Sequence, residues 1–389
     1  MKYKKVIYFA IIFVNLVGVS PKDIFAQDAA PSLNVDAKAA VLLEPTTGKI
    51  IIEQNAHEKL PPASITKVMT MLLIYEAVEQ GKIKWDDMVT VSEHAANMGG
   101  SQVYLETFEQ QTVRDLIKSI AIASANDAAV AMAEFLAGSE EGFVIKMNEK
   151  AKQLGMKNTN FINACGLDAD NHLTTAYDIA LMSQELITRY PDVLELTGIW
   201  MDTIIHDTAR GKEEFGLANT NKMLRSYSGT TGLKTGSTGE ALFCISATAE
   251  REELNLVAVI LGSPSSSIRF NEARKLLDYG FANYAVSQGE EAGTSKGDIK
   301  VYKGEEDSVE VVIKEQISIV IPKGNHVTLE SEVELLDALN APVERGTKAG
   351  EVIYTIEGKE VGRSDLIVAK DVEKASLSHM MKRLLFNWF

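Results

Sequence analysis

Basic residues are fewer than acidic residues in this chain. Among its 389 residues, 39 are lysine or arginine and 54 are aspartate or glutamate, which gives a formal net charge of -15. Such a surface repels a phosphate backbone and offers no basic stripe of the kind that nucleic acid needs. We therefore expect no nucleic-acid partner.

Cysteine is nearly absent. The two cysteines, Cys165 and Cys244, allow at most one disulfide. They can pair if the chain is exported, because an exported chain meets an oxidising environment. Each also lies among small and apolar residues, which fits two buried free thiols that act as small hydrophobes. The sequence leaves both alternatives open.

Apolar runs long enough to span a bilayer are also missing. One shorter run, from Val6 to Val19, follows three lysines in the first five residues and precedes a possible cleavage site at Ala26. That order is typical of a secretory signal peptide. An uncleaved anchor is the alternative, but it needs roughly 20 apolar residues. We predict a signal peptide over residues 1–26 and a mature protein exported to the outer face of the cytoplasmic membrane.

The last residues have an amphipathic pattern. Between Ser376 and Phe389, polar and basic residues fall on faces other than the apolar one. The apolar positions recur at helical spacing and are Leu377, Met380, Met381, Leu384, Leu385, Trp388 and Phe389. Such a helix is suited to a membrane interface, although docking on its own domain is the alternative. We expect residues 371–389 to bind the membrane surface.

The length suggests two domains plus terminal segments. In the first, over residues 27–287, strand patterns stand at both ends and helical patterns between them. Strands are expected at 39–43, 50–52, 203–207, 231–234, 242–249 and 254–261, and helices at 64–80, 112–123, 127–136, 141–154, 175–188 and 268–285. This order predicts an α/β (α+β) domain whose antiparallel sheet, flanked by helices, joins the two ends of the domain.

A second domain is expected after a glycine-rich linker at residues 288–297. Further strand patterns occur at 309–313, 317–321, 327–329 and 352–356, and the last of these leads through a glycine turn into one more strand. They predict a small all-β C-terminal domain over residues 298–370.

Ser64-Ile65-Thr66-Lys67 is the one Ser-x-x-Lys sequence in the chain. At the start of a helix this spacing puts both side chains on one face, so that the amine of Lys67 can reach the hydroxyl of Ser64. A serine becomes a good nucleophile when a neighbouring base takes its proton, and a lysine with a lowered pKa can be that base. A capping serine beside a surface lysine is the alternative.

Two further motifs follow in order. Ser124-Ala125-Asn126 falls between two expected helices, in a turn that can present its side chains to a cleft. Lys234-Thr235-Gly236 ends an expected strand and is followed by Ser237. The ordered set, with each member at an element boundary, favours an active site over chance matches.

With these motifs the chain resembles the low-molecular-mass penicillin-binding proteins of the serine D-alanyl-D-alanine carboxypeptidase family. The resemblance covers nearly the whole chain, including Asn163–Leu167, His172, Thr174–Asp178, Gly232–Ala241, Arg269–Ala273 and Leu276–Phe281. It implies a catalytic domain of the serine β-lactamase/transpeptidase type. It also implies an enzyme that removes the terminal D-alanine from peptidoglycan pentapeptides, limits cross-linking, affects cell shape and needs no metal or organic cofactor.

The resemblance also assigns roles to single residues. Ser64 attacks the penultimate D-alanine, Lys67 takes the serine proton, and Ser124 passes a proton to the departing D-alanine. The residues implied in substrate binding are Asn126, Lys234, Thr235, Gly236, Ser237 and Arg269. Among them Lys234 attracts the terminal carboxylate, helped by Thr235 and Arg269, and the N–H groups of Ser64 and Ser237 form the oxyanion hole. Asn126 binds the substrate amide and holds Lys67.

Two positions depart from the family pattern. Some relatives have a histidine where this chain has Ser237, and Cys165 replaces a residue that is often polar or cyclic. The backbone donor at Ser237 survives the change. The deacylation rate and its pH dependence are left open.

Other functions predict different sequences. A class A β-lactamase shares the three motifs but needs a Glu-x-x-x-Asn pattern, and none occurs between Asn126 and Lys234. We therefore expect β-lactams to be slow, trapping inhibitors. A non-catalytic peptidoglycan-binding protein predicts eroded motifs, whereas all three are intact. Asp168–His172 contains possible metal ligands, but no second cluster accompanies it, so a polar loop is expected.

Overall fold

The computed structural model describes residues 33–324, 328–378 and 381. The predicted signal peptide lies outside the described residues, as do residues 379–380 and 382–389 of the predicted interfacial helix. Both stay predictions. Among the helices that the structure describes, none is long and apolar enough to cross a membrane.

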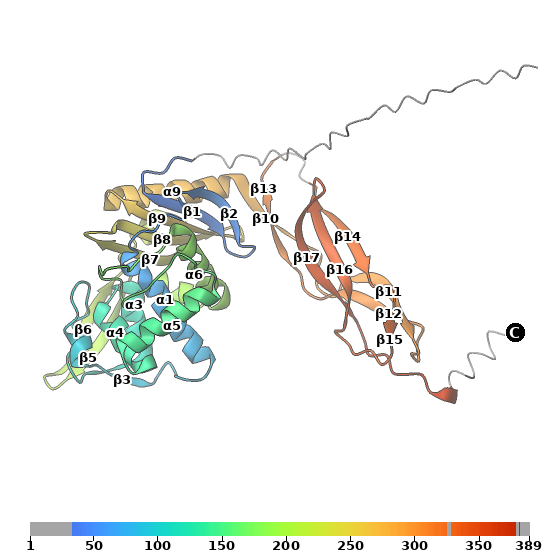
Figure 1. Cartoon of the computed structure of the whole chain (residues 1–389), viewed down its shortest axis with the longest axis horizontal. Coiled ribbons are helices and arrows are strands. Elements are labelled where there is room, and N and C mark those ends of the chain that lie inside the picture. Colours follow the sequence, from blue (N-terminus) through green and yellow to red (C-terminus); the bar gives the residue numbers. More distant parts are fainter. Residues whose placement is uncertain (1–32, 325–327, 379–380, 382–389) are drawn as a thin grey trace, which may run out of the picture. The chain divides into compact units, whose positions relative to one another are not determined.

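A five-stranded antiparallel sheet lies at the centre of the first part of the chain (Figure 1). Its strands follow the order β2 (Lys49–Gln54), β1 (Ala39–Glu44), β9 (Leu254–Ser263), β8 (Leu242–Arg251) and β7 (Thr230–Thr238). The N-terminal hairpin pairs with β9, with Val41 opposite Val259. The prediction that one sheet joins both ends of this region is confirmed.

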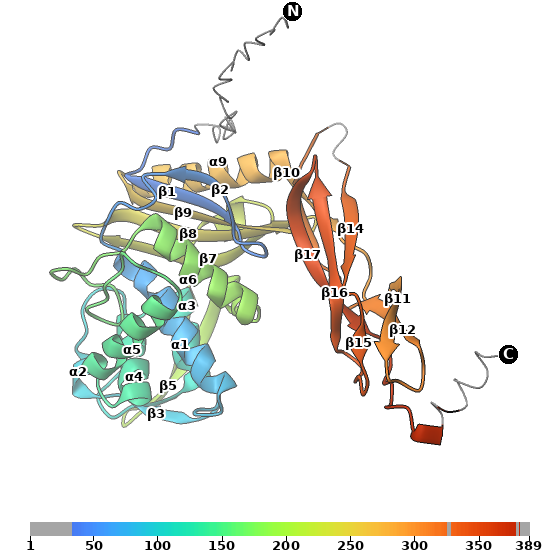
Figure 2. The same ribbon diagram turned by 45° about the vertical axis from the view of Figure 1, so that its right-hand side comes forward.

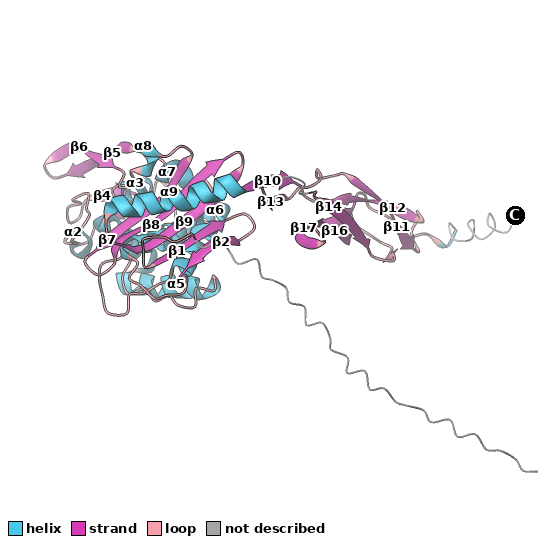
Figure 3. Ribbon diagram, turned by 90° about the horizontal axis from the view of Figure 1, so that it is seen from above, coloured by secondary structure: helices cyan, strands magenta, loops and turns pink. Residues whose placement is uncertain are grey.

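Helices pack on both faces of this sheet (Figures 2 and 3). Helix α9 (Ser266–Asn283) shares one hydrophobic cluster with the strands, and α6 (Ala176–Arg189) shares the other. Successive strand residues point to opposite faces, so Val41 belongs to the cluster with α6 and Leu42 to the cluster with α9. Both faces are buried, which explains why these strands are continuous apolar runs.

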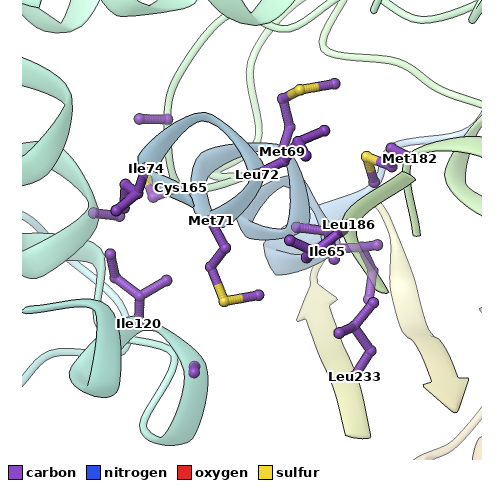
Figure 4. Packing of buried hydrophobic residues seen from close by; sticks show 14 of the residues in the cluster. Ile65, Met69, Met71, Leu72, Ile74, Ile120, Cys165, Met182, Leu186 and Leu233 are labelled. Atoms are coloured by element: carbon purple, nitrogen blue, oxygen red, sulfur yellow. The ribbon is translucent and has the colours of Figure 1, made fainter. Parts of the chain in front are cut away.

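Helix α1 (Lys67–Glu79) is buried on all sides (Figure 4). Met69, Met71, Leu72 and Ile74 point in different directions around it, and each is fully buried. A helix that is apolar all round is suited to such a core position. It starts after a short 3₁₀ turn, η1 (Ala63–Thr66), which corrects the prediction of one continuous helix from residue 64.

The region contains further helices and strands. They are β3 (Met88–Thr90), α2 (Glu93–Ala96), β4 (Gln110–Thr112), α3 (Val113–Ile122), α4 (Asn126–Ala137), α5 (Glu140–Gln153), α7 (Val193–Thr197), β5 (Met201–Thr208), β6 (Gly211–Ala218) and α8 (Met223–Ser226). A threonine caps α6: the hydroxyl of Thr175 accepts from the N–H of Asp178 at 3.1 Å.

Several boundaries differ from the prediction because strand pairing extends or creates strands that the local pattern does not show. Strand β7 continues to Thr238, so Lys234-Thr235-Gly236 lies inside a strand and not at its end. Helix α9 stops at Asn283, since β10 (Tyr284–Gln288) pairs with β13 (Ser318–Pro322). The predicted linker is shortened by β10 and by β11 (Ser295–Tyr302).

The C-terminal part is a β domain. Its six-stranded sheet has the order β14 (Glu330–Leu335), β16 (Lys348–Ile356), β17 (Lys359–Val368), β12 (Ser308–Ile313), β11 and β15 (Leu339–Asn340). Its alternating apolar side chains, such as Val309 and Val311, form a core of their own. The prediction of a C-terminal all-β domain is confirmed. The prediction of a strand at 327–329 is wrong for the two described residues, Thr328 and Leu329, which lie outside any strand and precede β14.

Candidate active site

Ser64 and Lys67 lie close together where η1 passes into α1. Ser64 is partly exposed, whereas Lys67 is fully buried. The Nζ atom of Lys67 lies 3.1 Å from the Oγ atom of Ser64. The three-residue spacing therefore brings the serine hydroxyl and the lysine amine within reach of each other, and the alternative of a surface lysine is wrong.

Two shorter hydrogen bonds orient the amine of Lys67. Its Nζ atom donates to Oδ1 of Asn126 at 2.6 Å and to the carbonyl of Cys165 at 2.6 Å. Both oxygens can only accept. In a neutral lysine these two bonds use both N–H groups, so the lone pair is directed at the hydroxyl of Ser64.

Burial makes the neutral form of Lys67 accessible. It lowers the pKa of Lys67 to about 8, although Cys165 and the carboxylate of Asp127 act in the opposite direction. The carboxylate of Asp127 is engaged elsewhere, by the N–H groups of Val103 and Leu105 at 3.1 Å each. The hydrogen-bond partners of Lys67 in the described part of the chain are uncharged.

The second motif lies in the turn between α3 and α4. Ser124 is buried, has a positive φ of 62° and closely precedes α4. No hydrogen bond joins its hydroxyl to Ser64 or Lys67 in the part of the chain that the structure describes. The Nδ2 atom of Asn126 donates to the carbonyl of Gly99 at 2.6 Å, which turns Oδ1 toward Lys67.

The third motif lies on β7, an edge strand of the five-stranded sheet. A Cβ atom on Gly236 would lie 2.8 Å from the backbone nitrogen of Ser64 and 3.1 Å from that of Ile65. Glycine therefore allows the strand to pass directly beside Ser64. Ser237 follows and is exposed. An edge strand offers unpaired backbone groups to an extended peptide.

Lys234 is a second buried lysine, 1% exposed. Burial, together with the positive charges of Lys67 and Arg269, lowers its pKa well below the usual value. Its Nζ atom donates to the neutral carbonyl of Thr235 at 3.0 Å, and no ion pair joins it to a carboxylate within the described residues. The Oγ1 atom of Thr235 lies 2.6 Å from that of Thr220. The protonated form of this buried amine has no counter-charge among the described residues, and an anionic ligand would supply one.

Arg269 donates hydrogen bonds to β7 and to two neighbouring elements. Its Nη1 atom donates to the carbonyls of Gly236 at 3.1 Å and Cys244 at 3.2 Å, and Nη2 donates to Oγ of Ser266 at 3.2 Å. Its Nε atom is buried without a hydrogen-bond partner among the described residues. Burial lowers the pKa of Arg269 to about 10. Arg269 thus links β7 to the neighbouring strand β8 and to the start of α9.

The segment Asn163–Leu167 contributes to the site in a way that sequence reasoning missed. Its backbone supplies the carbonyl of Cys165 to Lys67. The Oδ1 atom of Asn163 accepts from the N–H of Gly166 at 2.6 Å and so shapes the turn. A Cβ atom on Gly166 would lie 1.9 Å from the oxygen of Ala63. Asn163 and Gly166 are the residues that could have indicated this turn from the sequence. The contact made by a backbone carbonyl could not be predicted, because every residue type has one.

Both cysteines are buried free thiols. The disulfide alternative is therefore wrong. Burial raises the pKa of the Cys165 thiol and raises that of Cys244 to about 11. Each thiol thus stays protonated at neutral pH, and the hydrogen bond between Cys165 and Lys67 is made by the carbonyl of Cys165.

The loop from Asp168 to His172 is tied to the protein through the histidine. The Nδ1 atom of His172 accepts from the N–H of Ile162 at 3.1 Å, and Nε2 lies 2.9 Å from Oγ1 of Thr66. Both ring nitrogens are engaged. No cluster of histidine, cysteine and carboxylate residues that could hold a metal ion occurs among the described residues.

The site has a partly exposed serine, a buried lysine whose free base faces it, and a second buried lysine on an edge strand. Together with the antiparallel sheet between helices, this arrangement defines a serine acyl-transfer enzyme of the penicillin-binding type.

Comparison with known proteins identifies the family. Residues 25–265 match the family model described as D-alanyl-D-alanine carboxypeptidase, and residues 287–374 match the one described as penicillin-binding protein 5, C-terminal domain. The chain belongs to the D-alanyl-D-alanine carboxypeptidase family, as its motifs predicted.

Individual relatives support the same family assignment. The chain is 40% identical over 388 residues to D-alanyl-D-alanine carboxypeptidase DacF of Bacillus subtilis, covering 99% of both chains. It is similar to the structure of penicillin-binding protein 5 of Haemophilus influenzae, with a TM-score of 0.75 and 32% identity over 88% of this chain and 98% of that one. It is also similar to penicillin-binding protein D2 of Listeria monocytogenes in its ampicillin-bound form, with a TM-score of 0.54 and 35% identity over 64% of this chain and 100% of that one.

Proposed function

We propose that this enzyme removes the terminal D-alanine of peptidoglycan pentapeptides through an acyl-enzyme on Ser64. Family membership supports the reaction. One observation carries the assignment of residues: two obligate acceptors, Asn126 Oδ1 and the Cys165 carbonyl, hold the amine of Lys67 so that its remaining direction faces the Ser64 hydroxyl.

Acylation begins when the lone pair of Lys67 takes the proton of the Ser64 hydroxyl and Oγ bonds to the carbonyl carbon of the penultimate D-alanine. Negative charge moves to the carbonyl oxygen, which accepts from the N–H groups of Ser64 and Ser237. The C–N bond to the terminal D-alanine then breaks, and its nitrogen receives the proton from Lys67 through Ser124. Water hydrolyses the ester with Lys67 as base and regenerates Ser64.

The substrate lies along the edge of β7 as an added strand. Lys234 binds its terminal carboxylate, and Thr235 adds a hydroxyl donor. Arg269 contributes positive charge and fixes the strand. The second N–H of Asn126 Nδ2 donates to the substrate amide, because the first is used by Gly99. The buried amine of Lys234, which has no carboxylate partner among the described residues, supports selection of a free carboxyl terminus over an internal peptide bond.

We also propose an organisation for the whole chain. Residues 1–26 are a signal peptide, 27–287 the catalytic domain, 298–370 the β domain and 371–389 an interfacial helix. The enzyme thereby acts at the outer face of the cytoplasmic membrane, where it limits cross-linking and affects cell shape. The lysine-led apolar start and the amphipathic end support this arrangement.

β-Lactams acylate Ser64 and are released slowly. The ampicillin-bound form of a structural relative supports this proposal, as does the missing Glu-x-x-x-Asn pattern for rapid deacylation. A class A β-lactamase and a non-catalytic binding protein are not favoured.

The proposal is tested by intact-mass spectrometry of the purified protein after treatment with a fluorescent penicillin. We expect one adduct, mapped to Ser64 by peptide analysis and missing in Ser64→Ala, together with release of D-alanine from a peptide ending in D-Ala-D-Ala. An adduct without D-alanine release would contradict the carboxypeptidase reaction. An adduct on another residue would contradict the proposed nucleophile.

The acylation rate is expected to depend on pH through Lys67. Its pKa of about 8 means that the free base, the active form, becomes scarcer as pH falls. The single-turnover rate constant at saturating penicillin should drop about ten-fold per pH unit below 7 and level off above 8. A flat profile from pH 6 to 8 would exclude Lys67 as the base.

A further inference from the structure

A chain of hydrogen bonds connects His172 to the peptide bond that precedes the nucleophile. Thr66 is fully buried and His172 is 3% exposed. The Oγ1 atom of Thr66 lies 2.9 Å from Nε2 of His172 and donates to the carbonyl of Ala63 at 2.9 Å. We propose that Thr66 and His172 are positioning residues that orient the Ala63–Ser64 peptide and so aim the Ser64 N–H at the developing oxyanion. This rests on the proposed function.

The donor in each bond follows from the groups involved. A backbone N–H can only donate, so Nδ1 of His172 accepts from Ile162 at 3.1 Å. Burial lowers the pKa of His172 to about 4, which keeps the ring neutral with its proton on Nε2. That proton goes to Oγ1 of Thr66, and the hydroxyl proton of Thr66 goes to the carbonyl of Ala63.

Holding this carbonyl fixes the N–H of Ser64. The carbonyl of Ala63 and the N–H of Ser64 belong to one planar trans peptide unit, in which oxygen and hydrogen point in opposite directions. A rotation of the oxygen therefore rotates the N–H by the same angle. The bond from Thr66 also polarises the amide and strengthens its N–H as a donor.

Two other observations show that this peptide is closely confined. Ala63 has a positive φ of 47°, an uncommon conformation for alanine that its surroundings must maintain. Gly166 lies so close that a Cβ atom there would be 1.9 Å from the oxygen of Ala63. The same turn offers the Cys165 carbonyl to Lys67. One segment of chain thus sets both the base and the oxyanion donor.

The test compares Thr66→Val, which keeps the shape but loses the hydroxyl, with Thr66→Ser, which keeps it. Thr174→Val is the matched control, since Thr174 is also fully buried and its Oγ1 atom lies 2.7 Å from that of Thr159, outside the Ala63–Ser64 peptide. We expect Thr66→Val to slow penicillin acylation about 10- to 100-fold at nearly unchanged KM for the peptide. Thr66→Ser and Thr174→Val should stay within about three-fold of the parent enzyme.

Two further readouts separate this role from a structural one. Binding of a peptide boronic acid, whose tetrahedral adduct on Ser64 carries the oxyanion, should weaken by the same factor as acylation. The acid limb of the pH–rate profile, which we assign to Lys67, should stay at the same pH. A shifted limb would mean that Thr66 acts through the base, and an unchanged boronate affinity would overturn the proposal.

Two substitutions of His172 test the proposal if Thr66→Val fails to fold. The amide of His172→Gln can replace the Nε2 donor to Thr66, whereas His172→Asn can replace the acceptor for Ile162. We expect the glutamine variant to acylate faster than the asparagine variant, and the reverse order would overturn the inference. Parent enzyme that forms no Ser64 adduct would instead contradict the proposed function, so the two failures are distinguishable.

Discussion

Replacement of Lys67 by alanine is expected to slow acylation of Ser64 by about 10³- to 10⁴-fold. The variant loses the group that lies 3.1 Å from the serine oxygen, and general-base assistance contributes roughly 10² to 10⁴ in rate. The upper part of that range applies because the other partners of Lys67 among the described residues are an amide oxygen and a carbonyl, which are poor bases for the serine proton. Stopped-flow fluorescence with a labelled penicillin measures the rate constant.

A matched control separates catalysis from the loss of a buried lysine. Lys150 is 6% exposed and belongs to α5, where it pairs with Glu76 at 3.6 Å and Glu185 at 3.3 Å. Lys150→Ala should lower the melting temperature and leave acylation of the folded fraction near that of the parent enzyme. Equal losses of acylation in both variants would show that Lys67 is structural.

The sequence predicted those parts of the site that depend on side-chain identity at fixed local spacing. Ser64 and Lys67 are three residues apart on one helical turn, so their contact follows from helix geometry. Asn126 and Gly236 were found as members of an ordered set, but their contacts depend on how α4 and β7 pack against α1. The sheet connecting both ends of the region was predictable from the order of elements.

Contacts made by backbone atoms were beyond the sequence. The carbonyl of Cys165 orients Lys67, and any residue carries such a carbonyl. The side chain of Cys165 led instead to the question of a disulfide. Likewise β7 extends past Gly236 because Ser237 and Thr238 pair with β8, and that partner is set by tertiary structure. Local pattern ended the strand at Lys234, where the apolar residues stop.

Replacement of Lys234 by alanine is expected to impair one class of substrate selectively. For a peptide ending in a free D-Ala-D-Ala carboxylate, kcat/KM should fall about 10²- to 10³-fold, because a charge-assisted hydrogen bond in a buried site is lost. For the same peptide with an amidated C-terminus, which has no charge to pair with Lys234, the ratio of parent to variant should stay within about five-fold. Parallel assays of D-alanine and D-alanine amide release measure both ratios.

The amidated peptide also controls for an indirect effect. Lys67 and Lys234 are both buried, and the positive charge of Lys67 contributes to the lowered pKa of Lys234. Removing Lys234 therefore favours protonation of Lys67 and shifts its acid limb to higher pH, which slows both substrates equally near neutral pH. If Lys234 also contacts the terminal carboxylate, its removal lowers kcat/KM further for the free-acid peptide and not for the amidated one. Equal losses for the two peptides would assign Lys234 to tuning of the base, and the terminal carboxylate would then need another partner on β7.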